Sequence, residues 1–288
     1  MPFFDRFLRL FGPGGPRPQP GSPAPLTRDE LLRRFSAGDR DFAGADLTGV
    51  DLSGQPLREI DFSGAVLAGT LLTGADLTGA DFTGASLDGT DLRRAVLAGA
   101  TLRQANCLPS GSLNPPLMEG ADLRGADATG ADLSRADLRG AVLEDAVLRD
   151  ASLGRADLTG VRAARADLEG ASLRHAVADD ADLTGARLGS ADLGAASLAR
   201  AKLAGAGLVR ASLSRADLSG ADLSGADLRD ALLDRARLRG ARFAAASLAG
   251  ADLGDAEMDG DELEGADAAE VRNLAPPATP AAAGPETR

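Results

Sequence analysis

The side chains that could do chemistry in this sequence are few and far apart. His175 is the only histidine among the 288 residues, and Cys107 is the only cysteine. Metal sites and nucleophilic triads need several such groups brought together. We therefore expect no catalytic, cofactor-binding or metal-binding residues. Cys107 occupies a position that is otherwise taken by Leu, so we interpret it as a buried structural thiol.

Carboxylates are numerous but regularly placed, as Asp217, Asp222 and Asp227 illustrate. Two neighbouring carboxylates could act as a general acid and a general base. Recurrence at a fixed interval instead indicates turn-forming residues, because an Asp side chain can bond the backbone amides that follow it. This reading predicts a protein that is not an enzyme.

The composition favours an elongated molecule with a narrow interior. Aromatic residues make up 3% of the chain, with no Trp or Tyr, while 36 residues are Gly. A core must then be built from Leu, Ala and Val, and small side chains cannot fill a thick one. The single cysteine fits a reducing compartment. The sequence has no apolar run long enough to span a membrane and no visible secretory signal, so we expect a cytoplasmic protein. Its richness in Ala, Gly, Arg and Asp indicates a bacterial origin of high GC content.

The net charge of −12 is spread unevenly. Residues 111–251 carry 20 acidic and 18 basic side chains, whereas residues 252–288 carry ten acidic and two basic ones. The middle of the chain is therefore almost neutral, and the acidity gathers at the C-terminal end. Solubility of a long exposed surface is sufficient to explain this pattern.

A period of five residues dominates the chain between Asp41 and Asp267. Leu or Phe recurs at every fifth position, usually two residues after Ala, and Gly often closes the unit, as in Ala75–Gly79. Five matches neither the helical nor the strand period, so the chain must turn once in each quintet and return the same two positions to the interior. Representative core positions are Leu47, Leu77, Phe82, Leu133, Leu183, Leu223 and Leu253.

These Ala-Asp-Leu-x-Gly quintets resemble those of the pentapeptide-repeat proteins. The resemblance implies an all-β fold, a right-handed quadrilateral β-helix (a β-solenoid) with four quintets in each coil and the Leu and the preceding small residue pointing inward. A short helix is expected to cap its N-terminal end. No cofactor is implied.

Four quintets per coil would stack residues that are 20 apart. Arg135, Arg155, His175, Arg215 and Arg235 would then lie in one line, interrupted by Ala195 and flanked by Arg174. We call the positions from 135 to 235 in this line the basic row. It could bind an acidic partner or a polyanion, or its charge could be balanced by Asp132, Asp192, Asp234 and Asp252, and the sequence leaves these readings open.

The repeat loses its register once, between Cys107 and Met118, in a stretch that contains three prolines. Their separation of eleven residues predicts one inserted residue. The insertion is either a bulge in one continuous rod or a bend between two solenoids. The expected segments are an amphipathic helical segment at 1–11, a Pro-rich linker at 12–26, a capping helix at 27–37, a first solenoid stretch at 38–109, a register break at 110–117, a second solenoid stretch at 118–270, and a disordered tail at 271–288.

The two chain ends carry different signals. Thr27 and Glu30 fit a capping box, with Leu26 and Leu31 placed for a hydrophobic staple, and this predicts a helix from Arg28 to Ser36. Near the start, five apolar residues at helical spacing precede the Pro-rich stretch. They form a candidate docking helix of Phe3, Phe4, Phe7, Leu8 and Phe11. This segment either folds back on the rod or stays loose, docks in a groove of a protein partner, or makes a weak contact with a membrane surface.

Taken together, these features predict a non-catalytic interaction or scaffold module whose protein partner the sequence does not name. The resemblance also implies an alternative, since one branch of the family mimics DNA, binds DNA gyrase and confers quinolone tolerance. The net charge and the elongated shape fit that branch, while the near-neutral middle and the basic row do not. Direct binding of nucleic acid is not expected.

Overall fold

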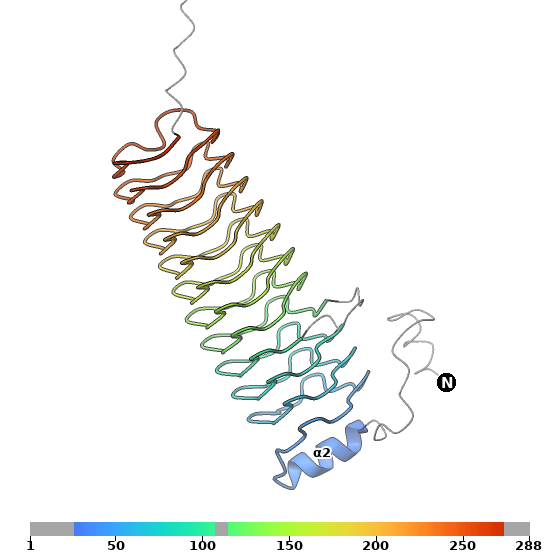
Figure 1. The fold of residues 1–288 in the computed structure, drawn as a ribbon. Coiled ribbons are helices and arrows are strands. Elements are labelled where there is room, and N and C mark those ends of the chain that lie inside the picture. Colours follow the sequence, from blue (N-terminus) through green and yellow to red (C-terminus); the bar gives the residue numbers. More distant parts are fainter. Residues whose placement is uncertain (1–25, 107–114, 274–288) are drawn as a thin grey trace, which may run out of the picture.

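The computed structural model describes residues 26–106 and 115–273. Over this part the chain winds into a single straight rod of stacked coils, with helix α2 (Arg28–Ser36) at its N-terminal end (Figure 1). The first and last described coils lie at opposite ends of the rod, so position along the sequence corresponds to position along the axis.

Parallel bridges between successive coils define the sides of the rod. Except across the register break described below, each bridge joins one residue to the residue 20 positions later, as in the series Asp137, Asp157, Val177, Ser197 and Asp217. An offset of 20 residues is four quintets, so each coil has four sides. The bridges in the described part are single residues, because the chain turns again before a longer strand can form.

One quintet shows how the backbone amides and carbonyls form their hydrogen bonds. The amide of Leu223 donates to the carbonyl of Arg242 in the next coil at 2.7 Å, and the amide of Arg242 donates back to Ala221 at 2.9 Å. Within the coil, the amide of Ala226 donates to the carbonyl of Leu223 at 3.0 Å, which closes a tight turn. Gly225 has a φ of +66° in this turn, a conformation that glycine adopts without steric cost.

The interior is apolar along the whole rod. All seven representative core residues are buried, with at most 3% of any of them exposed. Six of the seven Ala residues two positions earlier are buried as well and Ala45 is partly buried, so the predicted inward pair of Leu and Ala is confirmed. Phe42, Phe62 and Phe82 stack in successive coils, with ring centroids 6.4 and 5.6 Å apart. A small apolar void remains in the core where Ala163 and Ala178 occupy positions that Leu fills elsewhere.

Asp residues at the bridge positions form the turns, as predicted. The Oδ1 atom of Asp217 accepts a hydrogen bond from the amide of Ser219, and that of Asp222 accepts one from Ser224, both at 3.0 Å. The Oδ1 atom of Asp227 accepts from the amide of Arg229 at 3.3 Å. These three carboxylates lie on successive sides of one coil and hold their own turns, so they do not face one another as an acid–base pair would.

The register break differs from the sequence-based expectation. Before the break, Ser86 pairs with Asn106 at the usual offset of 20 residues. Across the break, Asp91 pairs with Leu117 and Asn106 pairs with Asp132, and both pairs have an offset of 26 residues. Asn106 and Leu117 therefore lie on consecutive sides of the rod, and the step between them contains six extra residues. The prediction of a single inserted residue was wrong. The ladder of bridges crosses the break on all four sides, so the rod is continuous and has no bend there.

Helix α2 covers the first coil. Its N-cap is Thr27, whose Oγ1 atom accepts a hydrogen bond from the amide of Glu30 at 3.3 Å. The side chain of Glu30 bonds Arg33 at 2.7 Å. Leu26 and Leu31 both pack against the apolar core, as the staple predicted, and Leu31 is fully buried. The short N-terminal capping helix is thus confirmed, with the bounds expected from the sequence.

The C-terminal end is closed by a buried carboxylate that the sequence pattern did not predict. Arg242 has no bridge to position 262, so the last coil departs from the ladder on this side. Glu262, only 5% exposed, folds inward there and accepts hydrogen bonds from the amides of Asp259, Gly260 and Gly240 at 2.7, 2.8 and 3.2 Å. Its carboxylate thereby takes the place of the backbone carbonyl that the amide of Gly240 would otherwise meet.

We expect Glu262→Gln to destabilise the last coil in a pH-dependent way. Burial alone would raise the pKa of Glu262, but the bonds from backbone amides lower it on balance. Because the pKa is lower in the folded state, the Glu262 carboxylate stabilises the folded protein at pH values above the unfolded pKa of about 4.3. This stabilisation is lost as the pH falls through the folded-state pKa. The expected loss at pH 7 is about 1–2 kcal/mol, or roughly 2–4 °C in melting temperature.

Thermal melting of the wild type and of Glu262→Gln across a pH series measures this effect. The difference between the two melting temperatures should close as the pH falls below about 4. A difference that stays constant down to the lowest pH would show that the charge of Glu262 does not stabilise the end of the rod.

Several sequence-based expectations fall outside the described residues. They are the helical segment at 1–11 with Phe3, Phe4, Phe7, Leu8 and Phe11, almost all of the linker at 12–26, the burial of Cys107, and most of the tail at 271–288. Among the described residues, no helix is long and apolar enough to cross a membrane.

Candidate interaction surface

The basic row lies along one edge of the rod. The residues three positions before each member of the row form one series of parallel bridges. This series begins with Asp132, Ser152, Ser172 and Asp192 and continues to Leu232. The residues of the row therefore stack one above the other, separated by about 4.8 Å per coil. Each of them closes a quintet with a φ between +55° and +63°, the place that Gly takes in most other quintets.

Turn geometry makes this row project from the rod. A side chain at the closing position of a quintet points away from the core, and Arg135, Arg155, His175, Arg215 and Arg235 are all exposed. The side of the rod that leads up to this edge mixes small and charged residues. The small ones include Ser152, Ser172 and Ser212 at bridge positions and Gly154 and Gly194 at turn positions. The charged ones are Asp132, Asp192, Arg174 and Asp234.

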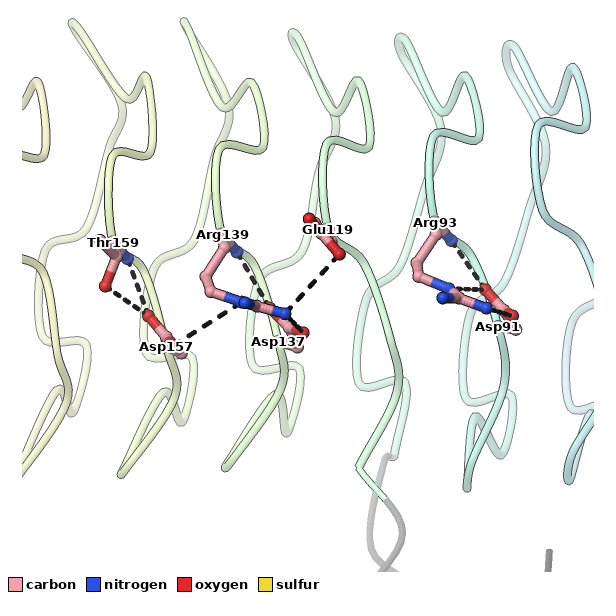
Figure 2. A network of polar contacts seen from close by, with 7 residues as sticks. All are labelled: Asp91, Arg93, Glu119, Asp137, Arg139, Asp157 and Thr159. Carbon is pink, nitrogen blue, oxygen red and sulfur yellow. Dashed lines mark hydrogen bonds and ion pairs between the residues drawn. The ribbon is translucent and has the colours of Figure 1, made fainter.

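Many basic residues elsewhere on the rod are paired with carboxylates. Figure 2 shows this for the next side of the rod, where Arg139 bonds Asp137 of its own coil at 2.6 Å. The same guanidinium lies 3.6 Å from Glu119 in the coil below and 3.9 Å from Asp157 in the coil above. Arg93 bonds Asp91 in the same way. Mixed charges thus alternate along this side and cancel locally.

The pKa values follow from this pairing. The side-chain hydrogen bonds from Arg139 hold the pKa of Asp137 below its usual range, and the Asp137 carboxylate in turn raises the pKa of Arg139. Both groups remain charged at all physiological pH values. The pairing on this side is therefore insensitive to pH, and nothing in it resembles a group poised for proton transfer.

Two corner arginines on the other edges, Arg165 and Arg200, are paired as well. Arg165 closes a quintet like the members of the basic row, and its guanidinium bonds the carboxylate of Asp145 one coil below at 2.8 and 2.6 Å. Arg200 bonds Asp180, also one coil below, at 2.8 and 2.7 Å. On these edges an arginine is stacked on an aspartate.

The basic row stacks arginine on arginine instead. Within the described part of the chain, the guanidinium groups of Arg135, Arg155 and Arg215 make no ion pair, and Arg235 lies 3.7 Å from Asp255. Arg94 and Arg210, on other edges, also make no ion pair in the described chain, but neither has a basic residue one coil above or below it.

The carboxylates that could have balanced the row are engaged elsewhere. Asp132 accepts from the amide of Ser134, Asp234 from the hydroxyl of Ser214, and Asp252 from the amide of Gly254. Asp192 pairs with Arg174 at 3.2 Å, so Arg174 is neutralised although it adjoins the row. None of these four carboxylates makes an ion pair with a member of the row, so Arg135, Arg155 and Arg215 have no direct counter-ion within the described chain.

Enzymatic chemistry finds no support in the described residues. In that part of the chain no group of three or more His, Cys, Asp or Glu side chains is arranged to hold a metal ion. His175 is exposed within the basic row. The ion pairs between coils were missed by the sequence reasoning, although pairs of Asp and Arg 20 residues apart, such as Asp145 and Arg165, carry the signal.

Comparison with known sequences agrees with the repeat. A family model described as pentapeptide repeats matches in eight copies, over residues 60–99, 75–106, 118–155, 151–189, 191–230, 226–260 and 236–270. No curated protein gives a significant match.

Solved structures with similar sequences include three repeat proteins. HetL, a pentapeptide repeat protein involved in heterocyst differentiation regulation in the cyanobacterium Nostoc, is 36% identical over 82% of this chain and 96% of its own, with a TM-score of 0.36. A pentapeptide repeat protein of the Arabidopsis thaliana thylakoid lumen is 31% identical over 35% of this chain and 67% of its own (TM-score 0.32). The plasmid-mediated fluoroquinolone resistance protein QnrB1 is 20% identical over 76% of this chain and 96% of its own (TM-score 0.31).

Proposed function

This chain belongs to the pentapeptide-repeat family, and from that premise we propose that it works as a non-catalytic interaction module, a rigid rod whose exposed rows of side chains bind a protein partner. The observation that carries the proposal is that the positions within each quintet have different roles. The inward positions are used for packing, and the bridge-position carboxylates hold turns or pair with arginines. The surface that is left for function is the pattern of outward side chains, and in the basic row unpaired arginines occupy neighbouring coils.

DNA mimicry, the alternative, requires a face that is continuously anionic. The carboxylates of this rod alternate with arginines, as Asp91, Asp137 and Asp157 do along one side. Such a face offers a basic partner little net charge. We therefore expect the full chain to leave DNA supercoiling by gyrase unchanged, and inhibition at submicromolar protein would favour the alternative.

Affinity capture from native lysate tests the proposal. The full chain is compared with a chain that lacks residues 1–25, which tests the candidate docking helix at the same time. We expect both to retain the same saturable protein partner, because the rod carries the recognition surface. Loss of the partner or of a membrane fraction on truncation would assign recognition to residues 3–11, and absence of any saturable partner for the full chain would contradict the proposal.

A further inference from the structure

We infer that the basic row is the docking site for an acidic α-helix of a partner protein, laid along the axis of the rod. The inference rests on the proposed function and specifies the chemistry of the partner. The edges of the rod differ in what lies one coil below an arginine. Arg165 and Arg200 are stacked on carboxylates, whereas Arg155 is stacked on Arg135. Like charges about 4.8 Å apart repel one another, and an anionic ligand that runs along the row relieves this repulsion.

The spacing of the row selects the shape of the ligand. Its arginines repeat at about 4.8 Å per coil. An α-helix with an acidic residue in each turn presents carboxylates about 5.4 Å apart, which accumulates a mismatch of only about 3 Å over the five coils from Arg135 to Arg235. An extended strand presents same-face side chains about 6.7 Å apart and would be out of step by about 10 Å. Flexible arginine side chains can absorb the first mismatch but not the second.

The surroundings favour a protein segment over a nucleic acid or an anionic membrane. The whole chain carries a net charge of −12, so a large polyanion is repelled by most of the molecule that surrounds the row. A short acidic helix meets only the local charge. The quintets closed by Arg155 and Arg215 have only serine and glycine at their outward bridge and turn positions, which leaves room there for a helix about 10 Å wide.

The row also predicts where the partner's acidic residues lie. Arg135 and Arg155 occupy neighbouring coils, as do Arg215 and Arg235, while His175 and Ala195 separate the two pairs. The helix should therefore carry carboxylates in its first two and last two turns and can have neutral residues between them. Its length should be about 16 residues, since the five intervals cover about 24 Å.

The test measures binding of synthetic peptides of about 20 residues to the full chain by fluorescence anisotropy. The probe is an Ala/Gln-based helix with glutamates on one face in the first two and last two turns. A peptide of the same composition has its glutamates spread around the helix, and a third carries central prolines that prevent helix formation. Heparin, duplex DNA and vesicles that contain anionic lipid represent the other classes of ligand.

Two double variants distinguish the row from general electrostatics. Arg155→Gly with Arg215→Gly removes two unpaired members of the row, and Arg165→Gly with Arg200→Gly removes two paired corner arginines of other edges. Both change the charge by the same amount, and both introduce Gly at a positive φ, which the turn accepts, so the fold is preserved.

We expect the one-face helix to bind the wild type, to lose about five- to tenfold in affinity for the row variant, and to lose less than about twofold for the matched control. Binding should weaken as the salt concentration rises. Equal affinity for both variants, equal affinity for the proline peptide or the scattered peptide, or tighter binding of DNA, heparin or vesicles would overturn the inference. So would absence of peptide binding, and a partner retained in the lysate capture would then leave the proposed function standing with another surface responsible.

Discussion

Replacing Leu223 with Asp is expected to unfold several coils in the middle of the rod. Leu223 is fully buried between Leu203 of the coil below and Phe243 of the coil above, which are fully buried themselves. The substitution forfeits about 1.5–3 kcal/mol of apolar burial and places a carboxylate where no partner can reach it. The combined loss should exceed about 5 kcal/mol, which is exceptional for a single substitution.

The repeat architecture determines how this damage spreads. Each coil contacts only the coils above and below it, so the loss of one coil exposes two new ends and lets the rod fray from both. Hydrogen exchange should therefore show lost protection that is centred on residues 203–243 and declines toward both ends. Circular dichroism should show a lower melting temperature and a broader transition.

Leu232→Asp is the matched control. Leu232 lies two quintets further along the chain, at an outward bridge position, and 41% of its surface is exposed. The same chemical change there should alter the free energy of unfolding by no more than about 0.5 kcal/mol. If Leu223→Asp melted like Leu232→Asp, the inward direction of the central Leu of the quintet would be wrong, and the described fold with it.

The regular part of this fold was predictable because one rule is applied many times. Once the period of five is seen, the burial of Leu47 or Leu253 follows without knowledge of any tertiary contact. The same regularity places Arg135 and Arg155 one above the other as soon as the number of quintets per coil is known. That number came from the family resemblance, since a period of five by itself is compatible with other numbers of sides.

The irregular parts could not be predicted because they depend on contacts that the period does not describe. The sequence separation of Asn106 and Leu117 does not reveal whether these residues lie on consecutive sides of the rod or two sides apart. Only the pairing of Asp91 with Leu117 shows that the sides are consecutive and that six residues are inserted. Glu262 reads as a surface residue in a weak quintet. Its burial follows from the unmatched amides near the last coil, which are a property of the folded end.

The ion pairs could be predicted from the sequence only in part. The pairing of Arg165 with Asp145 could be predicted from their separation of 20 residues, whereas the three contacts of Arg139 also depend on side-chain direction. That Arg135, Arg155 and Arg215 make no ion pair within the described chain follows from the positions of the side chains around them. It is therefore a structural result, although its residues were visible in the sequence.

The second large effect is expected at the N-terminal end, where Leu31→Asp should detach helix α2 from the first coil. Leu31 is the fully buried residue of this helix, and it packs against the core cluster that includes Phe42. Two further contacts depend on its position. The guanidinium of Arg34 lies 4.6 Å from the ring centroid of Phe42, and it donates a hydrogen bond to the carbonyl of Asp41 at 2.9 Å. The expected loss is about 3–5 kcal/mol, the range for removing a large buried side chain.

The position of this loss distinguishes it from that at Leu223. A capping element protects the end of a repeat array, so its removal should fray the first coils and leave the distant ones intact. Hydrogen exchange should increase over residues 41–62, with little change beyond the register break. Arg33→Ala on the same helix, where 69% of the side chain is exposed, should change stability by less than about 0.5 kcal/mol. Uniform loss of protection along the whole rod would contradict nearest-neighbour coupling between coils, and unchanged protection of the first coil would show that α2 does not cap it.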